Sequence, residues 1–188
     1  MAKVSVIEAA SFAAWKHGTQ TRKDKAKTPY ICHPLQVAAL VESVGCTENV
    51  VIAAVLHDVI EDCDCDENEL ALFAGNVVTQ IVLEVSHNKA LSKQERSARL
   101  LSDMRTVMTP SAFMVKMADR TQNLRDLSNM GDLPDGFDYE KVFKKADEGQ
   151  TMLHILDSRE DCKHQLSFKM MAFHLKRAVD KILDQRHE

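Results

Sequence analysis

The sequence predicts an all-α protein that forms one domain of about eight or nine helices. Apolar residues recur at intervals of three and four along most of the 188 residues, as they do on one face of an α-helix. No segment shows the period-two alternation of a half-buried strand, and no internal repeat is found. A chain of this length is long enough to bury a hydrophobic core of its own.

Start and stop signals bound the helices expected in the first half. The first, over 4–17, carries a stripe of alanines and is followed by a basic, polar loop over 18–29. The second begins near His33 and Pro34 and runs to Val44, because Gly45 is a natural stop. Thr47 is the expected N-cap of a third helix, over 48–62.

The second half is divided in the same way. A short helix over 66–75 is closed by Gly75, and another follows over 76–88. A polar amphipathic helix is expected over 92–108, and Pro110 opens the next, over 110–127. After a loop rich in Gly, Pro and Asp over 131–138, two further helices are expected over 139–156 and 167–183.

Composition excludes several classes of function. The formal net charge of −4 gives no electrostatic case for binding nucleic acid or an acidic membrane surface. No apolar run approaches the roughly 20 residues that span a bilayer, and the N-terminus does not resemble a signal peptide. Five scattered cysteines are typical of reduced thiols, so a cytoplasmic location is expected. A zinc site at Cys63 and Cys65 is a weak alternative, because no second cysteine pair accompanies it.

The stretch VLHDVIEDCDCDE, residues 55–67, places charged groups directly after an apolar run. On one continuous helix His57 lies one turn before Glu61, and Asp58 lies one turn before Asp62. Carboxylates at a helix C-terminus oppose the helix dipole, so a cation is expected to compensate them. A solvated acidic turn is the alternative interpretation.

Two other helices carry polar groups within apolar sequence. Asp119 and Asn123 are four residues apart in one of them, and His33 stands at the start of another. Together with His57 and Asp58 these side chains would form a mixed nitrogen and oxygen site. Such a site suits Mn²⁺ or Fe²⁺ better than Ca²⁺. Asp119 and Asn123 could instead lie on an ordinary solvent-exposed face.

The order His33, His57–Asp58 and Asp119 resembles the metal-binding pattern of HD-domain phosphohydrolases. More narrowly, TPYICHPLQVAALV, the segment AAVLHDVIEDCDCDENELALFAGNVVTQIVLEVS and VKMADRTQNLRDL resemble the RelA/SpoT hydrolase domain. The resemblance is to its stand-alone form, the small alarmone hydrolases related to metazoan SpoT homologues. It covers about residues 5–127. We therefore expect one HD-type domain over 1–188, with a core match over 1–130 and divergent C-terminal helices over 131–188.

The resemblance implies an all-α hydrolase with a single Mn²⁺. The reaction that the resemblance implies is removal of the 3′-pyrophosphate of guanosine tetra- or pentaphosphate (ppGpp or pppGpp), which gives GDP or GTP and pyrophosphate. The metal ligands that it implies are His33, His57, Asp58 and Asp119. It assigns Glu61 and Asp62 to activating the attacking water, Asn123 to supporting this acidic pair and the substrate, and Arg22 and Lys23 to the base and phosphates.

Further basic residues are candidates for phosphate binding. Lys89, Lys93 and Arg96 follow the segment VSHN, although a charged helix is more often a solvated face. After residue 127 the family has an Arg and a Tyr four residues later, and this chain offers Lys141 and Lys145 instead. This departure leaves the exact nucleotide open.

Rival functions share the same residues. An adenosine alarmone (ppApp), the 2′-phosphate of NADPH, or a nucleoside monophosphate or cyclic nucleotide could be the substrate of an HD enzyme. A non-catalytic alarmone-binding protein is a further alternative, but it would need no water-activating pair. The amphipathic C-terminal helix could form a homodimer surface, or it could simply close the core.

Overall fold

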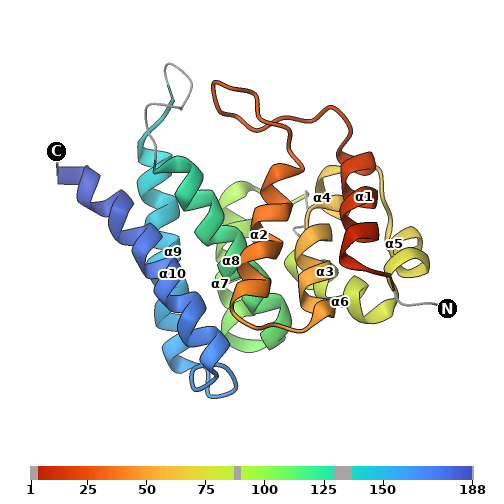
Figure 1. Cartoon of the computed structure of the whole chain (residues 1–188). Coiled ribbons are helices and arrows are strands. Elements are labelled where there is room, and N and C mark those ends of the chain that lie inside the picture. The colour runs from red at the N-terminus through yellow and green to blue at the C-terminus, as the bar shows by residue number, and fades with distance from the viewer. Residues whose placement is uncertain (1–3, 87–89, 129–136, 188) are drawn as a thin grey trace.

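The computed structural model describes residues 4–86, 90–128 and 137–187, and it confirms the all-α fold class (Figure 1). Within these ranges no strand is found, only an isolated bridge between Thr21 and Pro29. The helices are α1 (Val6–His17), α2 (Cys32–Ser43), α3 (Glu48–Leu56), α4 (Val59–Asp62), α5 (Glu67–Ala74), α6 (Asn76–Val85), α7 (Lys93–Thr106), α8 (Pro110–Leu127), α9 (Glu140–Ser158), α10 (Leu166–Asp184) and the short 3₁₀-helix η2 (Gln185–His187).

Helix α3 is the centre of the fold. Every residue from Val50 to Leu56 is buried, as is expected for a helix that is apolar on all sides. Helices α1, α2, α6 and α8 pack around it, and Figure 1 shows α2 and α3 side by side in the middle of the molecule. The residues that follow α3 are therefore held by the best-buried element of the chain.

The single helix that the sequence predicts over 48–62 is two helices in the structure, and that expectation is corrected. α3 ends at Leu56 and α4 begins at Val59. Asp58 has φ −102° and ψ −5°, a sparsely populated conformation in which many active-site residues lie. The Asp62 amide still donates to the Asp58 carbonyl at 2.7 Å, so the predicted one-turn spacing of these two residues survives the break.

The two C-terminal helices complete the bundle on the far side of α8. Helix α10 packs on both α8 and α9, and its apolar face is buried. Gly149 permits the close approach of α9 and α10, because a Cβ there would lie 2.9 Å from a Val179 methyl group. None of the described helices is long and apolar enough to cross a membrane. Residues 131–136 of the predicted Gly-Pro-Asp loop lie outside the described residues.

Candidate active site

Three parts of the fold bring the four predicted metal ligands together. His33 lies in the first turn of α2, His57 and Asp58 lie at the break between α3 and α4, and Asp119 lies on α8. His33 Nε2 is 3.2 Å from Asp119 Oδ1, and His57 Nε2 is 3.1 Å from Asp58 Oδ2. His57 Nε2 is also 3.9 Å from Asp119 Oδ1. His33, His57 and Asp58 each offer a ligand atom within 4.8 Å of the other two.

These side chains fit a divalent cation. The buried His57 ring contacts the Ala54 carbonyl through Nδ1 at 2.8 Å, which assigns the ring proton to that nitrogen. Its Nε2 atom makes no well-aligned hydrogen bond although it faces Asp58 and Asp119, so this nitrogen could bind a cation once its proton is displaced. Two imidazole nitrogens and two carboxylates form a donor set for a transition-metal ion such as Mn²⁺ or Fe²⁺.

Charge compensation keeps the site's carboxylates ionised. Burial alone would raise the pKa of Asp58 and of Asp119, but nearby cations outweigh it and hold both pKa values below the usual range. His57 acts on Asp58, and buried Lys116 acts on Asp119 through a 3.3 Å ion pair. Burial lowers the pKa of His57, yet Asp58 and Asp119 together raise it to about 9. Binding a cation would therefore displace a proton from this cluster.

The alternative zinc site has less support. Cys63 Sγ lies 3.3 Å from His17 Nδ1, and Cys65 is buried with its Sγ 3.8 Å from the Asp66 carbonyl. Burial, followed by neighbouring carboxylates, raises the pKa of both thiols to about 11. Among the described residues, the only group placed to hold a metal ion is His33, His57 and Asp58, and neither cysteine belongs to it.

The Glu61–Asp62 pair lies on α4, beside the metal-ligand cluster. The Asp62 main chain is fixed by Gln20, whose Nε2 donates to its carbonyl at 2.8 Å. The Asp62 side chain lies 3.4 Å from the Tyr30 hydroxyl. Glu61 instead lines a hollow on the molecular surface. Asp62 is the exposed member of the pair and Glu61 is half-buried, so the two carboxylates have different surroundings.

Asn123 joins a predicted ligand to a predicted substrate-binding residue. Its Nδ2 donates to Asp119 Oδ1 at 2.5 Å, and its Oδ1 accepts from Arg22 Nη2 at 3.0 Å. These bonds join Asn123 to a predicted ligand and to Arg22, and its expected support of the acidic pair stays a prediction. Arg22 Nη2 also contacts Asp126 at 2.8 Å. Lys23, in contrast, is exposed and takes no part in this chain of bonds.

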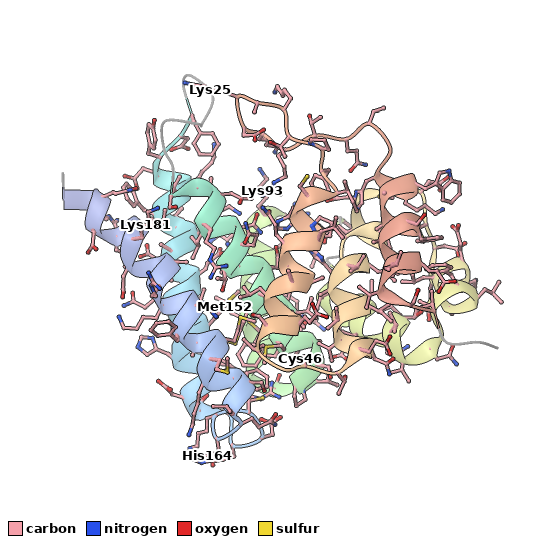
Figure 2. The ribbon with its side chains drawn as sticks, in the orientation of Figure 1. Lys25, Cys46, Lys93, Met152, His164 and Lys181 are labelled. Atoms are coloured by element: carbon pink, nitrogen blue, oxygen red, sulfur yellow. The ribbon has the colours of Figure 1, made fainter. Side chains whose placement is uncertain are left out.

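The hollow beside Glu61 is basic and has a volume of about 200 Å³. Lys93 and Arg96, two of the predicted phosphate-binding residues, line it together with Glu61; Lys89 lies outside the described residues. Figure 2 shows Lys93 at the same end of the bundle as the loop that carries Lys25. The structure thus brings two of the three predicted basic residues next to the acidic pair.

Sequence reasoning missed part of this pocket. Arg120, Ser97 and Glu148 also line it, and Glu148 accepts from both Arg120 and Ser97 at 2.6 Å. The only signal for Arg120 was its position directly after Asp119.

The two lysines in place of the family's Arg and Tyr differ in their surroundings. Lys141 is exposed and paired with Asp138 at 3.1 Å. Burial, followed by the charge of Arg120, lowers the pKa of Lys145. Lys145 is thus half-buried within reach of the charge of Arg120, whereas Lys141 lies at the surface.

The fold is an all-α bundle, and three parts of it contribute one histidine, a His–Asp doublet and one aspartate to a single cluster. An acidic pair and a basic pocket lie beside this cluster. These features define the class of HD-type metal-dependent phosphohydrolases. The family model of the HD domain matches residues 9–160, and the chain belongs to this family.

Comparison with known proteins places the chain more narrowly. It is 44% identical over 139 residues to the human guanosine-3′,5′-bis(diphosphate) 3′-pyrophosphohydrolase MESH1, covering 73% of this chain and 76% of that protein. It is 35% identical over 125 residues to the enzyme of the same activity from Aquifex aeolicus, covering 65% of this chain but 18% of that longer protein. A solved structure described as a metazoan ortholog of SpoT that hydrolyses ppGpp superposes with a TM-score of 0.78, at 29% identity, over 99% of this chain and 97% of that one. The resemblance to stand-alone alarmone hydrolases is confirmed.

Proposed function

We propose that this chain is a Mn²⁺-dependent hydrolase that removes the 3′-pyrophosphate of ppGpp and pppGpp, giving GDP or GTP and pyrophosphate. The proposal rests on one observation above all: Glu61 lines a basic pocket with Lys93, Arg96 and Arg120, directly beside a cluster suited to a divalent cation. The relatives that act on ppGpp support the choice of nucleotide. The whole chain, 1–188, acts as one HD-type unit in this proposal, in the cytoplasm.

The reaction requires a water molecule, a leaving group and a proton acceptor. A divalent cation held by His33, His57, Asp58 and Asp119 would neutralise charge on the phosphate and would acidify the attacking water. Glu61 and Asp62 take the proton as the water oxygen forms its bond to the phosphorus attached at the ribose 3′ oxygen. The bond between that phosphorus and the 3′ oxygen breaks, the 3′ oxygen takes up the proton that the acidic pair accepted from the water, and pyrophosphate leaves.

The basic residues divide the remaining phosphates and the base between them. Lys93, Arg96 and Arg120 face the hollow beside Glu61 and would hold phosphate oxygens, with arginine able to bind two at once. Arg22 lies on the other side, where Asn123 links it to Asp119. Lys23 adds charge from the exposed loop.

The decisive experiment is product analysis of purified protein with Mn²⁺ and ppGpp. Chromatography should find GDP, and phosphorus NMR should find pyrophosphate rather than orthophosphate. Orthophosphate would indicate a phosphatase. Absence of turnover in metal-loaded protein would overturn the proposal and direct the assay to ppApp, NADPH and nucleoside monophosphates, and then to a binding protein without catalysis.

Asp58→Ala should remove metal and activity together. Loss of a direct ligand is expected to weaken Mn²⁺ affinity by more than about 100-fold, beyond the effect of losing a supporting residue. Metal titration and turnover are measured on the same preparation. A variant that keeps both would remove Asp58 from the ligand set.

Glu61→Gln should separate binding from catalysis. It keeps the size of the side chain but cannot accept the proton, so kcat should fall by about 10²–10⁴-fold while metal affinity is retained. Single-turnover kinetics and metal titration check this. Loss of metal from the variant would instead make Glu61 a ligand.

A further inference from the structure

Tyr30 connects the predicted ligand cluster to the acidic pair. It is half-buried in the loop before α2, and its hydroxyl donates to Asp58 Oδ2 at 2.7 Å. The same hydroxyl lies 3.4 Å from Asp62 Oδ2. A single donor therefore lies between a carboxylate of the predicted ligand cluster and a carboxylate of the predicted water-activating pair.

The ring of Tyr30 is held from several sides. The buried His17 ring lies against it with centroids 4.7 Å apart, and the Arg22 guanidinium lies 5.6 Å from its centroid. Its main chain is paired as well, since its amide donates to the Gln20 carbonyl at 2.9 Å and its carbonyl accepts from the His33 amide at 2.9 Å. The position of the hydroxyl is thus fixed before any ligand arrives.

His17 links the ring of Tyr30 to Gln20. Its Nδ1 lies 3.0 Å from Gln20 Oε1, and Gln20 in turn holds the Asp62 carbonyl. The support behind Tyr30 and the support behind Asp62 are therefore joined through Gln20. Movement of the ring away from Asp58 would disturb the turn that carries the acidic pair.

Two neighbouring carboxylates repel each other unless a donor or a cation lies between them. A hydroxyl bonded to one oxygen of Asp58 also fixes the rotation of that carboxylate, so the other oxygen keeps a constant direction. Supporting residues of this kind typically change metal affinity by about 10–100-fold when they are lost.

We propose that Tyr30 is a positioning residue: its hydroxyl orients Asp58 for the cation and holds Asp62 beside it, and its ring supports Arg22. The role in turnover rests on the proposed function, whereas the role in metal binding does not. Removal of the hydroxyl and removal of the ring should therefore have different consequences.

The test compares Tyr30→Phe with Tyr30→Leu. Tyr30→Phe should weaken Mn²⁺ binding by about 10-fold or more, measured by calorimetry without nucleotide, and should lower kcat with little change in KM. Tyr30→Leu also removes the ring beneath Arg22, so KM should rise as well. The matched control is Tyr139→Phe, at the other tyrosine of the chain, which is exposed and whose ring lies edge-on to Phe137; its metal affinity should match wild type.

His17→Leu is a second variant that keeps the hydroxyl but removes the ring behind it, and a smaller loss of metal affinity is expected. Circular dichroism and thermal melting confirm that each variant is folded. Wild-type metal affinity in folded Tyr30→Phe and His17→Leu would overturn the proposal, as would a Tyr30→Phe effect confined to KM. Because calorimetry needs no substrate, the metal-binding result can be interpreted even if the protein does not hydrolyse ppGpp.

Discussion

The two ends of α8 are each covered by an arginine that lies over an aromatic ring. At the N-terminal end Arg159 lies 5.4 Å from the centroid of Phe113, and at the C-terminal end Arg22 lies 5.6 Å from that of Tyr30. Each arginine also contacts an aspartate, Asp161 or Asp126. The pattern of contacts is the same at both ends, but the remaining partners differ.

Arg159 is buried, and two of its four side-chain hydrogen bonds go to main chain that the fold has already fixed, while the other two go to Asp161. Its Nη1 donates to the carbonyls of Met104 and Met108 at 2.8 and 2.9 Å, near the end of α7. It therefore satisfies carbonyls that a helix C-terminus leaves unpaired.

Arg22 is bonded to side chains of the candidate site. Among the described residues, both of its side-chain hydrogen bonds run through Nη2, to Asn123 and Asp126. Side-chain partners can exchange for a phosphate at small cost, whereas a buried carbonyl left without a donor costs about 1–3 kcal/mol. The type of partner, and not the arginine–aromatic contact, therefore separates a structural arginine from a binding one.

The largest effect is expected on the free energy of unfolding, at the N-terminal end of α8, where Arg159 lies. Arg159→Ala should lower the free energy of unfolding by about 2–4 kcal/mol, because it leaves buried carbonyls unpaired and removes packing on Phe113. Chemical denaturation measures this change, and kcat and KM per folded molecule should stay at wild-type values. Arg177→Ala is the matched control: this arginine lies 5.6 Å from the exposed Phe173 ring, and its removal should cost less than about 0.5 kcal/mol. Equal losses in the two variants would contradict the comparison.

A smaller effect, on substrate binding and not on stability, is expected for Arg22 at the C-terminal end of α8. Arg22→Ala should raise KM by about 10-fold, equivalent to about 1.4 kcal/mol of binding, while metal affinity and melting temperature stay near wild type. Arg22→Lys should be intermediate, because it keeps the charge but loses the planar pair of donors. Steady-state kinetics with ppGpp test both variants. An unaltered KM in Arg22→Ala would place the nucleotide elsewhere.

The four side chains predicted as ligands could be picked out from the sequence because they lie in short local patterns, and the structure places them close together. Their role as ligands stays a prediction. Each of them can be recognised as a candidate ligand from its immediate neighbours: a histidine before Pro34, the His57–Asp58 doublet, and Asp119 on an apolar helix. Their convergence follows from α2, α3 and α8 packing on one another. The helix break at Asp58 was missed, since nothing in the residue types of 55–62 stops a helix.

The basic pocket and the Tyr30 contacts could not be predicted in the same way. Ser97 and Glu148 meet on different helices across 51 residues, and Arg22 and Asn123 meet across 101 residues. Such pairs depend on the packing of α7, α8 and α9 and on the path of the loop before α2. Local periodicity contains no information about either. Long charged side chains reach partners that spacing along the chain does not specify.

The smallest expected effect is a pH dependence of stability at the structural end. The hydrogen bond from Arg159 lowers the pKa of Asp161 to about 2, against 3.8 for the unperturbed group. A carboxylate whose pKa is lower in the folded state stabilises the fold above the unfolded pKa, and this contribution is lost as the pH falls from about 4 to about 2. Because the Asp161 side chain is half exposed, solvent screening limits it to less than about 1 kcal/mol.

Asp161→Asn isolates this contribution. Its unfolding free energy should fall slightly below wild type at pH 7, and the difference between the two proteins should shrink on acidification toward pH 2. Denaturation curves at several pH values measure the difference directly. A gap that stays constant with pH would show that Arg159 is held by the carbonyls of Met104 and Met108 alone. The aspartate would then be incidental at this end of α8, and main-chain partners would suffice to make an arginine structural.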